Sequence, residues 1–141
     1  MEELVKTLHE GGYSCVIRQG DVIRTFTQRG VNDLYALLTE EPHFLRGSSV
    51  ADKVIGKAAA ALLVAGGIKE LHAGVISEGA LELLTQAGIP TTYDKRVPYI
   101  INRTHTDRCP LEKRCAEATS AAECLPLIAS FVEGMKLSSH V

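Results

Sequence analysis

The chain has 141 residues, of which 45% are hydrophobic and 23% charged, and its formal net charge is -2. These values are ordinary for one globular domain, and the charge lacks the basic excess that is typical of nucleic-acid-binding domains. The longest uncharged run, residues 58–68, is well short of the roughly 20 residues that cross a bilayer.

The amino terminus and the cysteines favour a cytoplasmic location. The chain begins with Met1 and two glutamates, where a secretory signal peptide is basic. Its four cysteines (Cys15, Cys109, Cys115 and Cys124) follow neither a zinc-ribbon spacing nor a disulfide framework, and thiols stay reduced in a cytoplasm. We expect one domain over 1–141, with its core over 12–118, a C-terminal helix over 119–135 and a frayed tail over 136–141.

The first third predicts a short helix and a β-hairpin. Residues 2–10 place Leu4, Val5 and Leu8 on one side of a helix, which Gly11 and Gly12 end. Residues 13–18 and 22–27 are rich in β-branched and aromatic side chains, with a tight turn at 19–21. Both faces of the first strand carry apolar side chains, which is typical of a strand covered on both sides.

The middle of the chain predicts a buried helix. Residues 31–38 have helical apolar spacing and end at Pro42. A strand over 48–51 then leads into a helix over 52–65, which is apolar on every face after its first turn and therefore belongs in an interior. Gly56 would cost this helix about 1 kcal/mol, so its presence indicates a close approach by backbone or ligand.

A strand over 71–76, a helix over 77–87 and a strand over 89–93 complete an alternating pattern. Such alternation predicts parallel strands with right-handed crossovers, and the whole chain reads as an α/β fold: three α-β-α layers around a mixed sheet of about five strands, hairpin first. Ligands bind beyond the carboxyl ends of such strands. The two helix beginnings there, 49–56 and 76–79, attract anions through their N–H groups and dipoles.

The last third is less regular. Pro110 suits the first position of a helix, which would make Cys109 its N-cap. Because Pro126 interrupts the terminal helix, we expect that helix to start near Cys124 rather than at Ser120.

Four motifs carry a resemblance to a known family. They are VADKVIGKAA at 50–59, VISEGALELL at 75–84, VPYIINR at 97–103 and CPLE at 109–112. Over residues 12–118 the chain resembles a family of uncharacterised prokaryotic proteins catalogued as a domain of unknown function, which looks like the cytidine-deaminase-like superfamily in fold. The resemblance implies a mixed sheet of about five strands between helical layers.

The zinc ligands of a deaminase are missing from the matching positions. A zinc deaminase has His or Cys followed by Glu at the first core helix, and Pro-Cys-x-x-Cys at the second. Here the first position reads Ala51, Asp52 and Lys53, and the second reads Ser77, Glu78 and Gly79. We expect no zinc of the usual kind and no cofactor, because zinc requires three such ligands.

The first helix beginning offers four candidate ligand-binding residues. Asp52 and Lys53 could form a charged pair that holds a ligand or moves protons. In the structural interpretation, Asp52 caps the helix, alone or in a capping box with Ser49, and Lys53 extends into solvent. Lys57 either reaches an anionic group or extends into solvent from the surface.

The second helix beginning offers Ser77 and Glu78. Glu78 is a candidate site residue, although the helix dipole favours a carboxylate in a first turn in any case. Ser77 is a candidate that would also serve as an ordinary N-cap. His72, inside a predicted strand, reads mainly as a hydrogen-bonded structural histidine.

Three further candidates follow the last strand. Cys109 is either a reactive thiol, with its pKa lowered by the helix dipole and Arg108, or a residue that only folds a loop over the sheet. Asn102 and Arg103 could close a pocket, with Arg103 suited to a carboxylate or phosphate, or they could only form loop hydrogen bonds. A Cys109–Cys115 disulfide would require that no helix forms between them.

These candidates leave three hypotheses about function. The preferred one is a small-molecule-binding domain without a standard zinc site, whose pocket at the two helix beginnings is lined by Asp52, Lys53, Glu78 and Asn102 and takes an anionic or nucleotide-like ligand. The second is an enzyme, either a deaminase with rearranged ligands from Cys109, Cys115 and His105 or a thiol enzyme that uses Cys109. Asp52 and Glu78 are its further candidate catalytic residues. The third is a homo-oligomeric interaction module. None of them predicts a nucleic-acid or membrane partner.

Overall fold

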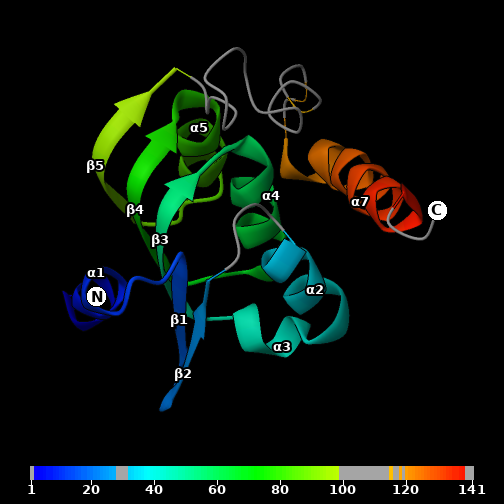
Figure 1. The fold of residues 1–141 in the computed structure, drawn as a ribbon. Helices are drawn as coiled ribbons and strands as arrows, with labels where there is room; N and C mark the ends of the chain where they lie inside the picture. Colours follow the sequence, from blue (N-terminus) through cyan, green and yellow to red (C-terminus); the bar gives the residue numbers. More distant parts are fainter. Residues whose placement is uncertain (1, 28–31, 99–114, 116–117, 119, 139–141) are drawn as a thin grey trace.

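The computed structural model describes residues 2–27, 32–98, 115, 118 and 120–138. Within them a five-stranded sheet lies between helical layers, as the alternating pattern predicted (Figure 1). Helix α1 (Glu2–Gly11) lies against one face of the sheet, and the other helices gather on the opposite face.

The sheet is mixed, with strand order β2-β1-β3-β4-β5. Strands β1 (Cys15–Gln19) and β2 (Val22–Phe26) form the predicted hairpin, and β1 also pairs antiparallel with β3 (Ser49–Ile55). Strands β3, β4 (Glu70–Ser77) and β5 (Thr91–Val97) run parallel. Their carboxyl ends therefore share one edge of the sheet.

Helix α4 (Lys57–Gly66) is the centre of the core. Residues 57–63 and 66 are all buried, which agrees with a sequence that is apolar on every face. It packs with Ile55 and Ile76 from the sheet and with Ile128 from the terminal helix. On the other face of the sheet, Leu4 and Leu8 of α1 cover Val16 and Ala51, which confirms that β1 is covered on both sides.

The remaining helices are α2 (Asn32–Glu40), α3 (Pro42–Leu45), α5 (Glu78–Gln86) and α7 (Ala121–Ser138). Helix α3 was not expected, because Pro42 was interpreted only as the end of the preceding helix. Proline fits the first position of a helix, and here it begins α3, whose Phe44 and Leu45 are buried.

The predicted boundary between β3 and α4 was wrong. The strand continues to Ile55 and the helix begins at Lys57 rather than at Asp52. Strand β3 is central, and its neighbours β1 and β4 extend the pairing to Asp52 and Ile55 respectively. Gly56 is consequently the N-cap residue, with φ -91°. Because it lies outside the helix interior, the expected loss of helix stability from a glycine there does not arise.

Two later boundaries also differ from the sequence. Strand β5 covers 91–97 rather than 89–93. Helix α7 begins at Ala121, where the N–H of Glu123 donates to Ser120 Oγ at 3.2 Å, and it continues past Pro126 to Ser138. Proline removes one helical hydrogen bond, whereas Cys124, Ile128 and Val132, four residues apart, bury a continuous stripe against the core. That burial keeps the helix together, and the predicted frayed tail does not begin at 136.

Within the described ranges, no helix combines the length and the apolar character needed to cross a membrane.

Strands β3 and β4 approach closely at Gly74. A Cβ atom at this position would lie 2.7 Å from the carbonyl oxygen of Lys53, which belongs to the backbone of β3 and cannot swing away. Only glycine fits there without moving one strand away from the other.

We therefore expect Gly74→Ala to lower the free energy of unfolding by about 1–3 kcal/mol, the usual cost of overpacking, as measured by urea denaturation. Gly79→Ala is the control, because the atoms nearest to its Cβ belong to the Lys57 side chain, at 3.2 Å and beyond, rather than to a strand backbone, and alanine favours helix. Equal losses in the two variants would contradict the close approach of the strands.

Candidate functional site

Two core helices begin side by side at the carboxyl edge of the parallel strands. Ile55 pairs with Ile76 in register, so β3 and β4 end together and lead into α4 and α5. The two beginnings also touch, because the Lys57 side chain lies against Gly79 in the first turn of α5. This convergence of helix beginnings is the arrangement that the sequence predicted.

The two beginnings differ in how their N–H groups are satisfied. Ser77 is the N-cap of α5, is fully buried, and accepts a hydrogen bond from the N–H of Ala80 at 3.2 Å. At α4 the N-cap is Gly56, which has no side chain to offer, and the described part of the chain supplies no acceptor for the N–H groups of Ala58 and Ala59. Within the described ranges, the beginning of α4 is thus the less completely capped of the two.

Lys57 is buried rather than extended into solvent. Its relative exposure is 9%, its aliphatic carbons pass over Gly79, and its Nζ donates to the carbonyl oxygen of Ala118. The ammonium therefore places a positive charge in the interior at the beginning of α4 and ties the segment before α7 to it.

Asp52 stands in β3, three residues before the strand ends, and not at a helix beginning. It is partly exposed, its Oδ1 accepts from the N–H of Val54 at 3.0 Å, and it is hydrogen-bonded to the Cys15 side chain on β1. Its predicted helix cap is wrong, because three residues and a glycine separate it from the helix. Desolvation by burial raises the pKa of Asp52 to about 6, against the opposing effect of these hydrogen bonds.

Asp52 belongs to a small acidic cluster with Cys15 and Asp33. Burial raises the pKa of the Cys15 thiol well above its ordinary value, and the negative charges of Asp52 and Asp33 raise it further. Burial also raises the pKa of Asp33, near the beginning of α2. Since the thiolate is the nucleophilic form, Cys15 is an inert thiol at neutral pH.

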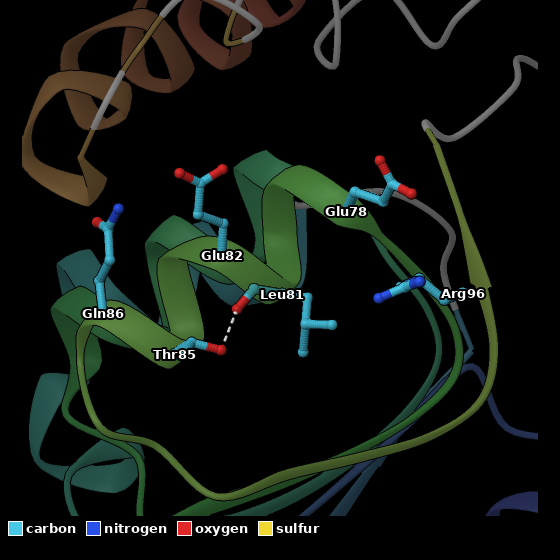
Figure 2. A pocket seen from close by; sticks show the side chains of 6 residues that line it. All are labelled: Glu78, Leu81, Glu82, Thr85, Gln86 and Arg96. Carbon is cyan, nitrogen blue, oxygen red and sulfur yellow. Dashed lines mark hydrogen bonds between the residues drawn. The ribbon is translucent and has the colours of Figure 1, made fainter.

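Glu78 lies at the head of a shallow groove along α5. The groove, of about 540 Å³, is lined by Glu78, Leu81, Glu82, Thr85 and Gln86 from the helix and by Arg96 from β5 (Figure 2). Glu78 itself is exposed. Its chain neighbour Gly79 contacts Lys57 at the beginning of α4, whereas the Glu78 side chain itself lies on the exposed side of α5.

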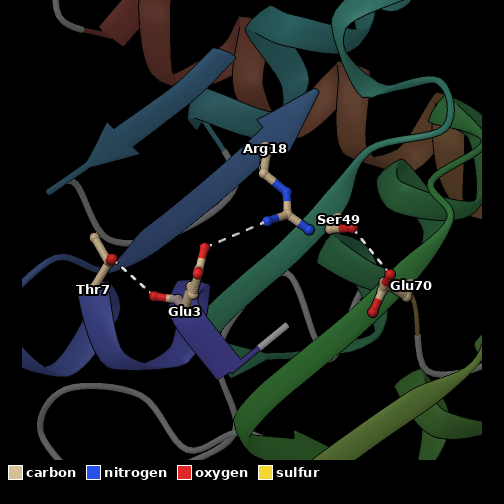
Figure 3. Close-up of polar contacts among 5 residues, drawn as sticks. All are labelled: Glu3, Thr7, Arg18, Ser49 and Glu70. Carbon is tan, nitrogen blue, oxygen red and sulfur yellow. Dashed lines mark hydrogen bonds and ion pairs between the residues drawn. The ribbon is translucent and has the colours of Figure 1, made fainter. Parts of the chain in front are cut away.

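Two predicted site residues lie elsewhere. Ser49 is at the opposite end of β3, where its hydroxyl donates to Glu70 Oε2 at 3.1 Å, beside the Glu3–Arg18 ion pair (Figure 3). It cannot form a capping box with Asp52, because a strand holds both. Lys53 is exposed in β3, one residue beyond Asp52, rather than in the first turn of a helix.

The other predicted candidates fall in part outside the described residues. Asn102, Arg103, His105 and Cys109 lie in residues 99–114, which the structure does not describe. Cys115 is described, and it is fully buried.

His72 is a hydrogen-bonded strand histidine, as the sequence indicated. Its Nδ1 lies 2.8 Å from Thr92 Oγ1, and its Nε2 lies 3.7 Å from Asp94 Oδ2 on the neighbouring β5. Among the described residues, no three His, Cys, Asp or Glu side chains are grouped so that they could hold a metal ion.

Two residues of interest were missed in the sequence. Cys15 was assigned only to a strand, and its partnership with Asp52 depends on the pairing of β1 with β3, which the sequence does not encode locally. Arg96 was placed beyond the last strand. The available signal was the pair of adjacent positive charges, Lys95 and Arg96. Because β5 continues to Val97, beyond its predicted end, Arg96 lies beside α5.

Comparison with known proteins decides the family. The profile of a family described as "Domain of unknown function (DUF1893)" matches residues 3–132. The chain belongs to this family. The domain-of-unknown-function family that the motifs indicated is thereby confirmed.

A solved structure supports the fold of this DUF1893 protein. A DUF1893 family protein from Thermotoga maritima superposes with a TM-score of 0.84 at 29% identity, over 92% of this chain and 87% of that one. RibD from Acinetobacter baumannii gives a TM-score of 0.45 at 16% identity, over 66% of this chain and 33% of that one, which is too slight a likeness to carry an argument. None of the curated proteins compared with the chain matches it.

The raised pKa of Asp52 predicts how stability depends on pH. The folded state holds the Asp52 proton up to about pH 6, whereas an unfolded aspartate loses it near pH 4. Between these values the folded state binds more protons, so stability falls as the pH rises, by about 2–3 kcal/mol in all. Above pH 6 this contribution is constant.

We expect urea denaturation from pH 4 to pH 8 to show this loss in the wild type and not in Asp52→Asn, which keeps the acceptor for Val54 but has no proton to lose. The Asn variant should match the wild type near pH 4 and exceed it at pH 7. Glu82→Gln, at an exposed carboxylate on α5, is the control and should follow the wild type. Parallel profiles for wild type and Asp52→Asn would contradict the assignment.

Proposed function

We propose that this DUF1893 protein binds a small ligand at the edge where β3 and β4 lead into α4 and α5, with an anionic or carbonyl oxygen of the ligand at the beginning of α4. One observation carries the proposal. Ala58 and Ala59 are buried, at 4% and 7% exposure, and their N–H groups have no acceptor among the described residues. Helix ends that are buried in this way are satisfied by caps, water or ligands.

The local electrostatics support an oxygen ligand there. The dipole of α4 and the buried ammonium of Lys57 both favour negative charge at this point. In open α/β sheets ligands bind beyond the carboxyl ends of the strands. In the deaminase superfamily, which the family indicated by the motifs resembles in fold, the reacting centre also lies at the beginnings of the two core helices.

The carboxylates limit the kind of ligand. Glu78 is the first residue of α5, and the acidic cluster joins Asp52 on β3 and Cys15 on β1 with Asp33 on α2. A ligand with several negative charges would be repelled by them. One anionic or carbonyl oxygen together with hydroxyl, amine or amide donors suits the site better, and nucleosides belong to this class.

The test is a thermal-shift screen of nucleosides, nucleotides, phosphate esters and inorganic phosphate against the wild type and Gly56→Ser. A serine at the N-cap accepts from the N–H groups of the following turn and thus occupies the position that the ligand oxygen would take. We expect a compound that raises the melting temperature of the wild type to lose most of this effect in Gly56→Ser, whose own stability is unchanged or higher.

Ala122→Ser supplies the control, because it adds the same hydroxyl at an exposed site in α7 and should respond like the wild type. A screen without any response, or equal responses in Gly56→Ser and the wild type, would overturn the proposal.

Proton transfer by Asp52 is a second candidate function, favoured by its pKa of about 6. A carboxyl group that titrates near neutral pH is suited to act as a general acid or base. Incubating the compounds found in the screen with the protein and following product formation from pH 5 to pH 8 tests this role. Activity should follow a transition near pH 6 and be lost in Asp52→Asn, whereas a wild-type rate with the same transition in that variant would exclude this role.

A further inference from the structure

The two edges of the sheet differ in charge. Strand β5 carries three consecutive charged residues, Asp94, Lys95 and Arg96, and charges on an edge strand protect it from pairing with another strand. Strand β2, at the opposite edge, carries only Arg24. Its neighbours Val22 and Ile23 are 54% and 50% exposed. The β2 edge therefore lacks the protection that the β5 edge has.

Arg24 is also turned back onto its own chain. Its Nη1 lies 3.0 Å from Glu41 Oε2, and its guanidinium carbon lies 4.9 Å from the centre of the Phe44 ring. This ion pair neutralises the one charge of β2. A second strand that approached the edge would meet apolar side chains and main-chain groups without a net charge.

The main-chain groups of β2 that face outward follow from the hairpin. Val22 pairs with Gln19 across a two-residue turn, so its N–H and C=O point toward β1. Alternation then directs the N–H and C=O of Ile23 and Thr25 away from β1. Among the described strands β2 pairs with β1 alone, and these four groups have no strand partner.

We propose that β2 pairs antiparallel with β2 of a second copy of the chain, so that the sheet continues across a two-fold axis. Two identical strands related by a two-fold axis run antiparallel and can pair with each other. Ile23 of each copy then faces Thr25 of the other. The outward N–H and C=O groups of both residues form hydrogen bonds between the two copies. The two Arg24 side chains face each other across the axis, and each keeps Glu41 as its counter-ion.

The size of this contact defines the kind of dimer. Two strands of five residues with two half-exposed aliphatic side chains each bury less than the 1,200–2,000 Å² or so of a stable interface. The dimer is therefore reversible and depends on concentration. It is independent of ligand binding at the helix beginnings, because β1 separates β2 from β3 and β4, the strands that lead into those helices.

Sedimentation over a range of protein concentrations tests the pairing. The wild type should pass reversibly from monomer to dimer as its concentration rises, and Ile23→Lys, which places a charge on the edge, should raise the dissociation constant at least tenfold. Val54→Lys is the matched control, because Val54 is 47% exposed on the central strand β3 and should leave the equilibrium unchanged. Circular dichroism checks that each variant is folded.

Three results would overturn the proposal: a wild type that stays monomeric at every concentration, equal effects of Ile23→Lys and Val54→Lys, or loss of the dimer in Tyr93→Lys on β5 but not in Ile23→Lys. Hydrogen exchange of the wild type gives a test that needs no variant. The amides of Ile23 and Thr25 should exchange more slowly as the protein concentration rises, whereas unchanged rates would exclude the pairing.

Discussion

The burial of α4 against the parallel strands is the constraint on which the rest of this structure depends. Its residues 57–63 present no polar side chain except Lys57, so every face of the helix has to be covered by protein. The sheet covers one side, α5 and α7 cover others, and the terminal helix tolerates Pro126 because Cys124 and Ile128 are needed in this contact. The layered architecture follows from one segment that cannot face water.

The same burial creates the candidate site. A helix that starts in the interior cannot rely on water for the N–H groups of its first turn, and the glycine at its N-cap offers no substitute. The ammonium of Lys57 is held at this point by the Ala118 carbonyl and the surface of Gly79. The fold thereby places positive potential where two strands end, and the acidic residues around it restrict what can bind there.

Much of the fold could be predicted from local pattern. The hairpin, the apolar helix and the alternation of strands and helices were visible because each repeats its apolar residues with the period of its own structure. The start of α4 was misplaced because Asp52 and Lys53 look like a polar first turn. Tertiary pairing with β1 and β4 holds them in a strand instead, and such pairing between distant segments leaves no local signal.

The site was predicted less completely for the same reason. Ser77 and Glu78 could be placed because a cap and a first-turn carboxylate are properties of one helix. The partnership of Asp52 with Cys15 joins residues from two strands far apart in the chain, and the burial of Lys57 depends on α5 and on Ala118. Contacts of this kind become visible only when the strands are assembled.

The burial of the described cysteines determines how fast thiol reagents can react with them in the native protein. Cys15, Cys115 and Cys124 are all buried, and Cys15 also lies next to a carboxylate that disfavours its ionised form. Alkylating reagents and mild oxidants act on accessible thiolates. Slow labelling of these three cysteines in the folded chain at neutral pH would therefore follow the opening of the core.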